Sequence, residues 1–164
     1  MGINEIIEKA ETAKASFYQH FRSKETLCCE WLAETHGRSE EFHRCILECE
    51  TPAREKVLQY FRALGPWLES RDFRGCPFSN TAADGESQSE EVRREVERHK
   101  LFLRDFLVEL AGGITDDEDE QTRLGNTLFL LYSGATAEAQ NVRSLWPVEQ
   151  AIAAVEGLLP EQCC

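Results

Sequence analysis

Apolar side chains in the middle of the chain recur at the spacing of an α-helix. Steps of four, three, four, three and four residues connect Val92, Val96, His99, Leu103, Phe106 and Leu110. A helix places residues at this spacing on one face. The pattern predicts a long amphipathic helix from about residue 88 to 111, with Ser87 and Glu90 at capping-box spacing and its end at Gly112-Gly113.

The same periodicity predicts a helix from about residue 52 to 70. Val57, Phe61, Leu64 and Leu68 share one of its faces, and Thr51 before Pro52 is expected to be its N-cap. The following segment, 71–87, is rich in Gly, Pro, Ser, Asn and Asp. This composition is typical of a loop, here with at most one short helical turn.

Two further helices are expected near the C-terminus, at 121–140 and 147–159. The acidic run 115–121 is interpreted as a loop and the first turn of the earlier one, where carboxylates oppose the positive end of the helix dipole. No alternation typical of β-strands appears. With 164 residues, 41% of them apolar, the chain can bury one sizeable core or one domain plus a small head. The expected fold class is all-α.

Each of the last two helices has more apolar surface than one core can cover. We expect the surplus to form a twofold homodimer, in which small residues such as Gly134 allow close helix approach. The residues expected at this interface are Leu128, Leu131, Ala135, Ile152, Val155 and Leu159.

The charge of the chain is strongly acidic and unevenly distributed. Its net charge is −12, yet residues 1–24 carry four Lys or Arg against three Glu, a local charge of +1. The field of the remaining −13 repels nucleic acid and anionic membrane, so that a polyanion could bind only at the head.

Several classes of protein are disfavoured by the sequence. No apolar run has the ~20 residues of a membrane span and no leader precedes the first helix, which indicates a cytoplasmic protein. We find no glycine-rich phosphate loop, GxSxG or His-Glu-x-x-His, and therefore expect no enzyme and no cofactor.

The seven cysteines include two sequence-adjacent pairs, which suits neither a disulfide framework nor zinc spacing. Reduced thiols and no metal are expected, although Cys45 and Cys49, with His36 and His43 nearby, leave a soft-metal or redox site conceivable. Cys76, flanked by Arg71 and Arg74, is either a thiolate sensor or a structural loop cysteine.

The first residues have the layout of a helix-turn-helix. "INEIIEKA" (3–10) predicts a short amphipathic helix, "ETA" a tight turn, and "KASFYQHF" a second short helix with Phe17 and Phe21 facing the core. In such a motif the second helix enters the major groove of DNA. Ser23 is expected to cap a third helix.

The stretch "AKASFYQHFRSKETL" (13–27) resembles the recognition helix and following helix start of the TetR family of bacterial transcriptional regulators. "FRGCPFSNTAAD" (73–84), the long helix after it and "LFLLYSGATAEA" (128–139) are similar to the ligand-binding half of one TetR subgroup. The resemblance implies a helix-turn-helix head at 1–24 and a helical effector-binding and dimerisation domain at 25–164. It also implies a repressor of operator DNA that responds to a small apolar or aromatic effector.

The resemblance assigns roles to individual residues. Toward DNA it places Lys14, Ser16, Tyr18, Gln19, His20 and Lys24, with Tyr18 and Lys24 on the backbone. In an effector pocket it places Trp67, Phe78, His99, Phe102, Phe106 and Phe129; the alternative for His99 is a hydrogen-bonded core histidine.

The sequence departs from the family pattern at three points. Glu11 and Thr12 stand where members usually carry Gly and an apolar residue in the turn, and Ile7 stands where a small residue is common. The additional helix that normally covers Ile3, Ile6 and Phe21 is not in this sequence. The head is therefore expected to be incomplete. The alternative function is a helical, dimeric interaction or ligand-binding protein that has lost DNA binding.

Overall fold

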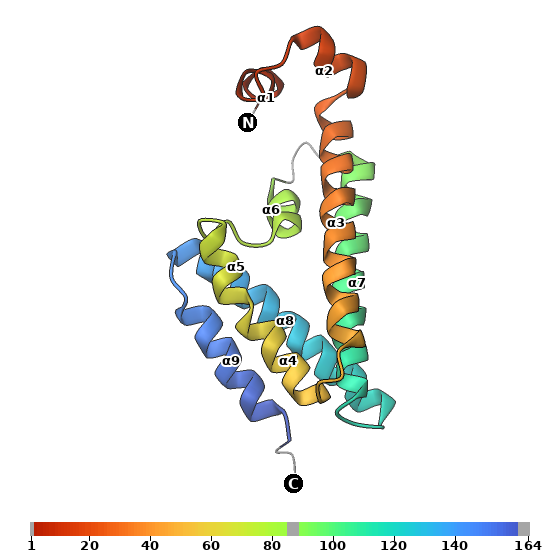
Figure 1. Ribbon diagram of the computed structural model, residues 1–164, viewed down its shortest axis with the longest axis vertical. Coiled ribbons are helices and arrows are strands. Elements are labelled where there is room, and N and C mark those ends of the chain that lie inside the picture. Colours follow the sequence, from red (N-terminus) through yellow and green to blue (C-terminus); the bar gives the residue numbers. More distant parts are fainter. Residues whose placement is uncertain (1, 85–88, 161–164) are drawn as a thin grey trace.

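A computed structural model describes residues 2–84 and 89–160, and every regular element in these ranges is an α-helix, as expected. Figure 1 shows a small head, made of α1 (Ile3–Lys9) and α2 (Lys14–His20), standing at one end of a long helix, α3 (Lys24–Glu48). The body contains α4 (Ala53–Arg62), α5 (Leu64–Ser70), α6 (Pro77–Ala83), α7 (Glu90–Gly112), α8 (Glu118–Val142) and α9 (Trp146–Leu158).

The turn of the head carries backbone strain. Glu11 has a φ of 50°, in the left-handed region where glycine is the favoured residue. The turn lies between Ile7, which is buried, and Phe17, which is 5% exposed. Ile3, Ile6 and Phe21 are half-buried.

The helix α3 begins where the sequence predicts. The Ser23 side chain accepts a hydrogen bond from the Thr26 backbone N–H at 3.2 Å, which satisfies one of the free donors at the helix start. The helix continues for 25 residues alongside α7. One uninterrupted element thus connects the head to the body.

The helix expected at 52–70 is interrupted. It forms two helices, α4 and α5, because Pro66 has no N–H to donate to the carbonyl of Arg62, and its ring crowds that carbonyl. Thr51 is not the N-cap either. Pro52 occupies that position and its φ of −55° suits the start of α4.

The long helix α7 begins two residues later than expected. Its N-cap is Ser89, whose side chain accepts from the Val92 N–H at 3.4 Å, whereas Ser87 lies outside the described residues. It ends at Gly112, as predicted. Further along, a Cβ on Gly125 of α8 would lie only 2.5 Å from the Val108 Cα, so that the two helices touch backbone to backbone.

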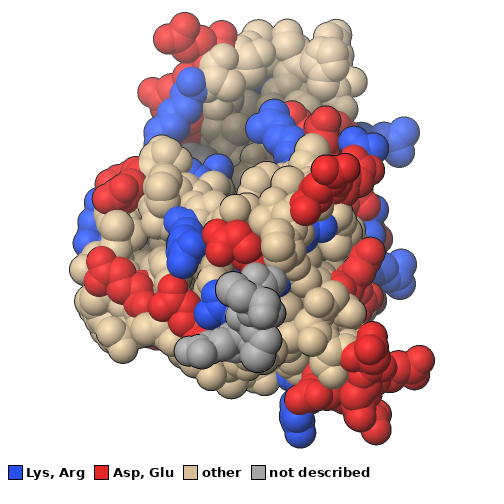
Figure 2. Space-filling model, turned by 60° about the horizontal axis from the view of Figure 1, so that its bottom comes forward, with Lys and Arg blue, Asp and Glu red and all other residues tan. Residues whose placement is uncertain are grey.

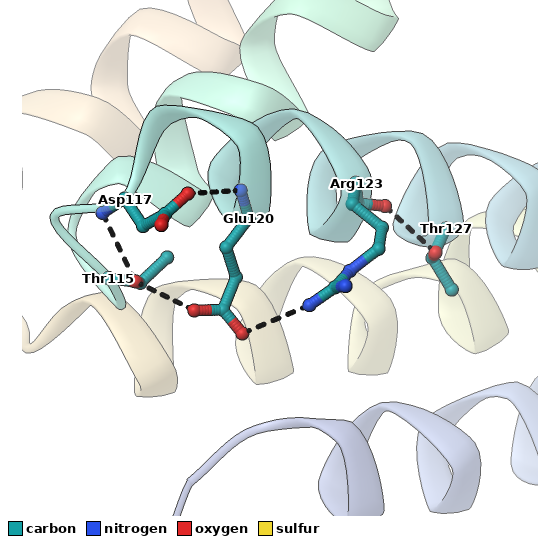
Figure 3. Close-up of polar contacts among 5 residues, drawn as sticks. All are labelled: Thr115, Asp117, Glu120, Arg123 and Thr127. Carbon is teal, nitrogen blue, oxygen red and sulfur yellow. Dashed lines mark hydrogen bonds and ion pairs between the residues drawn. The ribbon is translucent and has the colours of Figure 1, made fainter.

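The acidic run forms a loop and the first turn of α8, as expected (Figure 3). Asp117 is the N-cap, and its carboxylate accepts from the Glu120 N–H at 2.9 Å. Glu120 accepts from the Thr115 hydroxyl at 3.1 Å and pairs with Arg123 at 3.3 Å. The carboxylates thus stabilise the positive end of this helix.

The core has two parts. The larger one lies between α4, α5, α7, α8 and α9 and includes Val57, Phe61, Leu107, Leu128 and Val155. The smaller one joins α3, α6 and α7 through Leu32, Cys76, Phe78, Val92 and Val96. Cys76 is only 3% exposed and packs in the smaller core, which favours the structural cysteine over the exposed thiolate sensor.

The surface of the body has the acidity expected from its composition. Figure 2 looks toward the end of the molecule opposite the head and shows acidic groups spread over it, with basic groups between them. No described helix is long and apolar enough to cross a membrane.

Candidate DNA-binding head and effector cavity

Five of the six head residues expected to face DNA are exposed. Lys14, Gln19 and His20 of α2 and Lys24 at the start of α3 lie on the surface, and Tyr18 is 43% exposed. Ser16 is half-buried. The exposed set combines groups that bind phosphates with groups that can contact base edges.

Phe17 of α2 and Phe21, the residue directly after this helix, pack against each other in the head. The Phe17 ring is buried and lies 5.5 Å from the Phe21 ring between centroids. It also meets the edge of Tyr18 at 5.4 Å. The prediction that Phe17 faces the core is confirmed, and its packing orients the exposed face of the helix.

A cavity of about 350 Å³ lies in the body between α3, α5 and α6. Its walls are rich in aromatic rings, contributed by Trp31, Phe42, Tyr60, Trp67, Phe78 and Tyr132. The volume falls within the range of roughly 300–1,000 Å³ that is usual for small-molecule sites. The cavity is therefore large enough for a small ligand with flat apolar surfaces.

Three of the six expected pocket residues line this cavity, namely Trp67, Phe78 and His99. Phe102, Phe106 and Phe129 do not. Phe106 is 4% exposed and belongs to the larger core, Phe102 packs against His36 and His43, and Phe129 lies beneath the Lys100 ammonium at 5.8 Å. None of the three rings therefore faces the cavity: Phe106 is part of the larger core and Phe129 packs against it.

The sequence interpretation missed the contribution of α3. Trp31, Thr35, Arg38, Phe42 and His43 of this helix all line the cavity. The signal available was the spacing of Leu32, His36 and His43, four and seven residues apart, which places them on one buried helical face.

Three buried histidines connect the helices around the cavity. His36 Nδ1 and His99 Nδ1 share a hydrogen bond of 3.1 Å between α3 and α7, and Tyr60 Oη lies 3.3 Å from His43 Nε2. The His99 ring stacks on Phe78 at 3.5 Å and the His43 ring on Phe106 at 4.0 Å. His99 is thus both a cavity residue and a hydrogen-bonded core histidine.

Burial keeps these groups uncharged. It lowers the pKa of His43 to about 4 and that of His99 to about 3, with the nearby His36 adding to both shifts. Burial also lowers the pKa of His36 and raises the pKa of the Tyr60 and Tyr132 hydroxyls. Near neutral pH these histidines and tyrosines are therefore polar but uncharged.

Two arginines are the charged side chains of the cavity lining. Arg38 and Arg71 line the cavity, and no Asp or Glu of residues 2–84 and 89–160 does. Arg38 pairs with Glu34 on the surface of α3. Arg71 stands over the Trp67 ring, with its guanidinium carbon 5.4 Å from the centroid.

A groove of about 650 Å³ adjoins the cavity on the side of the head. Trp31, Arg71 and Pro77 line both spaces. The groove continues to Lys24 at the start of α3 and to Arg74. Arg71 thus stands between the aromatic cavity and a groove that reaches the base of the head.

No group of three or more potential metal ligands comes together in the described part of the chain. Its five cysteines, Cys28, Cys29, Cys45, Cys49 and Cys76, are free thiols. Lys100 donates to Ser79 Oγ at 2.7 Å and lies 3.8 Å from Cys76 Sγ.

Four of the expected dimer residues lie inside the protomer. Leu128, Ala135, Val155 and Leu159 are each at most 5% exposed in its core, which leaves them no surface for a second copy, while Leu131 and Ile152 are half-buried. The exposed apolar residues of the last two helices are others: Leu130, Val142, Trp146 and Leu158.

The fold and the head are those of a known group of proteins. A sequence model described as "Bacterial regulatory proteins, tetR family" matches residues 1–29, the head and the first turn of α3. The HTH-type transcriptional repressor NemR of Escherichia coli is 26% identical over 97% of this chain and 83% of its own. The chain is thus similar to TetR-family regulators, by the family model in its head and by this relative over nearly its whole length.

Two further relatives agree with this similarity. The HTH-type transcriptional repressor DhaR of Mycobacterium sp. strain GP1 is 27% identical over 96% of this chain and 82% of its own length. The crystal structure of SCO4454, a TetR-family transcriptional regulator from Streptomyces coelicolor, superposes with a TM-score of 0.86 at 26% identity, over 96% of this chain and 82% of that one. The similarity thus extends through the body as well as the head.

Proposed function

We propose that this chain is a cytoplasmic, homodimeric transcriptional repressor of the TetR family whose operator affinity is controlled by a small molecule. Residues 1–24 form its DNA-binding head, and residues 25–164 its effector-binding and dimerisation domain. It acts by binding and carries out no catalysis. The relatives that support this proposal are themselves repressors by name.

The exposed face of α2 supports DNA binding. Lys14 and Gln19 contact base edges, with Ser16 and His20 beside them, and Tyr18 and Lys24 hold the phosphate backbone. The local charge of +1 in residues 1–24 favours this contact within a chain of net charge −12.

The exposed apolar side chains of α8 and α9 support the homodimer. Leu130 is 67% exposed, Trp146 54% and Leu158 46%. A twofold contact between α8, α9 and their copies would cover this surface and place two heads against two half-sites, roughly 34 Å or a multiple apart.

One observation carries the regulatory part of the proposal: α3 is continuous from Lys24 at the head to the cavity. Trp31, Arg38 and His43 of the same helix line the cavity. A ligand that displaces this wall shifts or tilts α3. Because α3 is rigid, the head at its end moves with it, and the spacing of the two heads no longer fits the operator.

A selection from random-sequence DNA followed by gel-shift titration tests the proposal. Selection should enrich a palindrome with two half-sites, bound far more tightly than scrambled DNA and with an affinity that falls steeply with salt. Failure to enrich any sequence would refute the assignment as a DNA-binding regulator and favour an interaction or ligand-binding protein.

A further inference from the structure

The two cavity arginines are unusual in a chain with 30 acidic and 18 basic residues. Among the residues that line the cavity, the permanently charged side chains are Arg38 and Arg71. Although the chain is acidic, no described carboxylate lines this cavity. A cationic ligand would be repelled by the Arg71 guanidinium, which has no ion pair with a described carboxylate, whereas an anionic ligand would be attracted to it.

The two arginines differ in the contacts that their guanidinium groups already make. Arg38 forms an ion pair with Glu34. Arg71 forms none with any described carboxylate, and its guanidinium lies over the Trp67 ring, 5.4 Å from the centroid. A guanidinium has five donors in a fixed fork that matches a carboxylate, and stacking on an aromatic ring leaves the edge of this fork accessible. Arg71 is therefore the cation free to bind a ligand.

The remainder of the cavity selects a flat apolar group. Tyr60, Trp67 and Phe78 contribute ring faces or edges, and aromatic ligands gain from offset and edge-to-face contacts with such rings. His43 adds a polar atom. This residue is 3% exposed and lines the cavity, and its Nδ1 has no hydrogen-bond partner in the described protein.

We propose that the effector is an aromatic carboxylate, whose ring lies between Trp67 and Phe78 and whose carboxylate is bound by Arg71. The inference rests on the proposed function in calling this ligand the effector. Arg71 lies at the boundary of the cavity and the groove, so the carboxylate remains partly hydrated while the ring is buried. Arg71 is a specificity residue because it distinguishes acids from neutral or cationic compounds of the same shape.

The test compares three probes that share a naphthalene ring: naphthoate, naphthamide and naphthylmethylammonium. Trp31 and Trp67 line the cavity, so direct binding can be followed by tryptophan fluorescence and confirmed by calorimetry. We expect naphthoate to bind most tightly, the amide about tenfold more weakly, which corresponds to roughly 1.4 kcal/mol, and the ammonium most weakly.

The variant Arg71→Gln should reduce the affinity for naphthoate about tenfold and change that for naphthamide less than about twofold. Arg44→Gln is the matched control, because Arg44 is exposed on α3 and lines neither the cavity nor the groove; it should change neither affinity.

Equal binding of acid and amide, tighter binding of the ammonium, an equal loss of acid and amide binding in Arg71→Gln, or no binding of naphthoate would each overturn the inference. The titration contains no DNA. Its failure is therefore distinguishable from failure of the proposed regulator function, which the operator selection tests separately.

Discussion

His36 Nδ1 and His99 Nδ1 lie 3.1 Å apart and hydrogen-bond α3 to α7 inside the body. The bond needs one ring nitrogen to donate and the other to accept, so it exists only while at least one of the two rings is neutral. His36 and His99 are 5% and 4% exposed. The position of the helix that carries the head thus depends on uncharged histidines.

Stability should therefore fall as the pH drops below about 6.5. Burial lowers the folded-state pKa of His43 to about 4 and of His99 to about 3, so the unfolded chain binds more protons in this window. Each histidine should contribute about 1 kcal/mol less at about pH 5.5 than at about pH 7.5. Urea unfolding at the two pH values measures the difference.

His99→Phe serves as the comparison variant, because a phenyl ring keeps the stacking on Phe78 but does not titrate. Its loss of stability between the two pH values should be smaller than that of the parent by about 1 kcal/mol. An equal loss in both proteins would show that His99 does not take part.

The contact between α7 and α8 should not tolerate a side chain at Gly125. An added Cβ would lie 2.5 Å from both Cα and Cγ2 of Val108, which requires the helices to separate. We expect Gly125→Ala to cost about 1–3 kcal/mol despite the higher helix propensity of alanine. Thermal unfolding measures the cost as a lower Tm.

Gly37→Ala is the matched control in α3. A Cβ there meets nothing within 4 Å, so propensity alone acts and stability should rise by about 0.5–1 kcal/mol. If both alanine variants were stabilised, the close approach of α7 and α8 would be disproved.

The head should become more stable when Glu11 is replaced by glycine. Glu11 has a φ of 50°, a conformation that costs a residue with a side chain about 1–2 kcal/mol. In Glu11→Gly this cost disappears, and hydrogen exchange of the α1 and α2 amides should slow. Glu8→Gly makes the same change inside α1 and should do the opposite, by about 1 kcal/mol, because glycine weakens a helix.

The regular helices of the body could be predicted because apolar residues at a period of 3.6 leave a direct record in the sequence. The stripe from Val92 to Leu110 predicted α7 to within two residues. The break between α4 and α5 was missed, although Pro66 is visible in the sequence, because the apolar stripe continues across it.

The cavity could be predicted only in part. Whether an aromatic residue faces a void or the core depends on how helices approach one another, and composition does not record this. Phe78 and Phe106 are alike in sequence, yet one lines the cavity and the other packs beneath His43. Likewise Leu128 and Leu130 lie on different faces of α8, both of them apolar, and only the tertiary packing decides that Leu128 is buried and Leu130 is 67% exposed.

The homodimer should depend on the exposed apolar surface of α8. Leu130→Arg would place an unpaired charge in the proposed interface and should raise the dimer dissociation constant at least about a hundredfold. Leu101→Arg makes the same change at a residue of α7 that is 50% exposed, and should leave the dimer intact. Sedimentation velocity across a concentration series distinguishes the two; a monomeric parent, or equal effects, would contradict the interface.

Head substitutions should separate phosphate contacts from base contacts. Lys24→Gln removes a charge at the start of α3 and should weaken binding to all duplexes alike, while the slope of log affinity against log salt falls by about one. Gln19→Ala leaves the charge unchanged and should instead relax selection at one base pair of each half-site, worth about 1–3 kcal/mol. Both residues are exposed, so neither change should alter the fold.

Gel shifts with the selected palindrome and its single-base variants, each at several salt concentrations, measure both the salt dependence and the base preference. If Gln19→Ala weakened every sequence equally, or Lys24→Gln changed the base preference, the proposed orientation of α2 on DNA would be wrong.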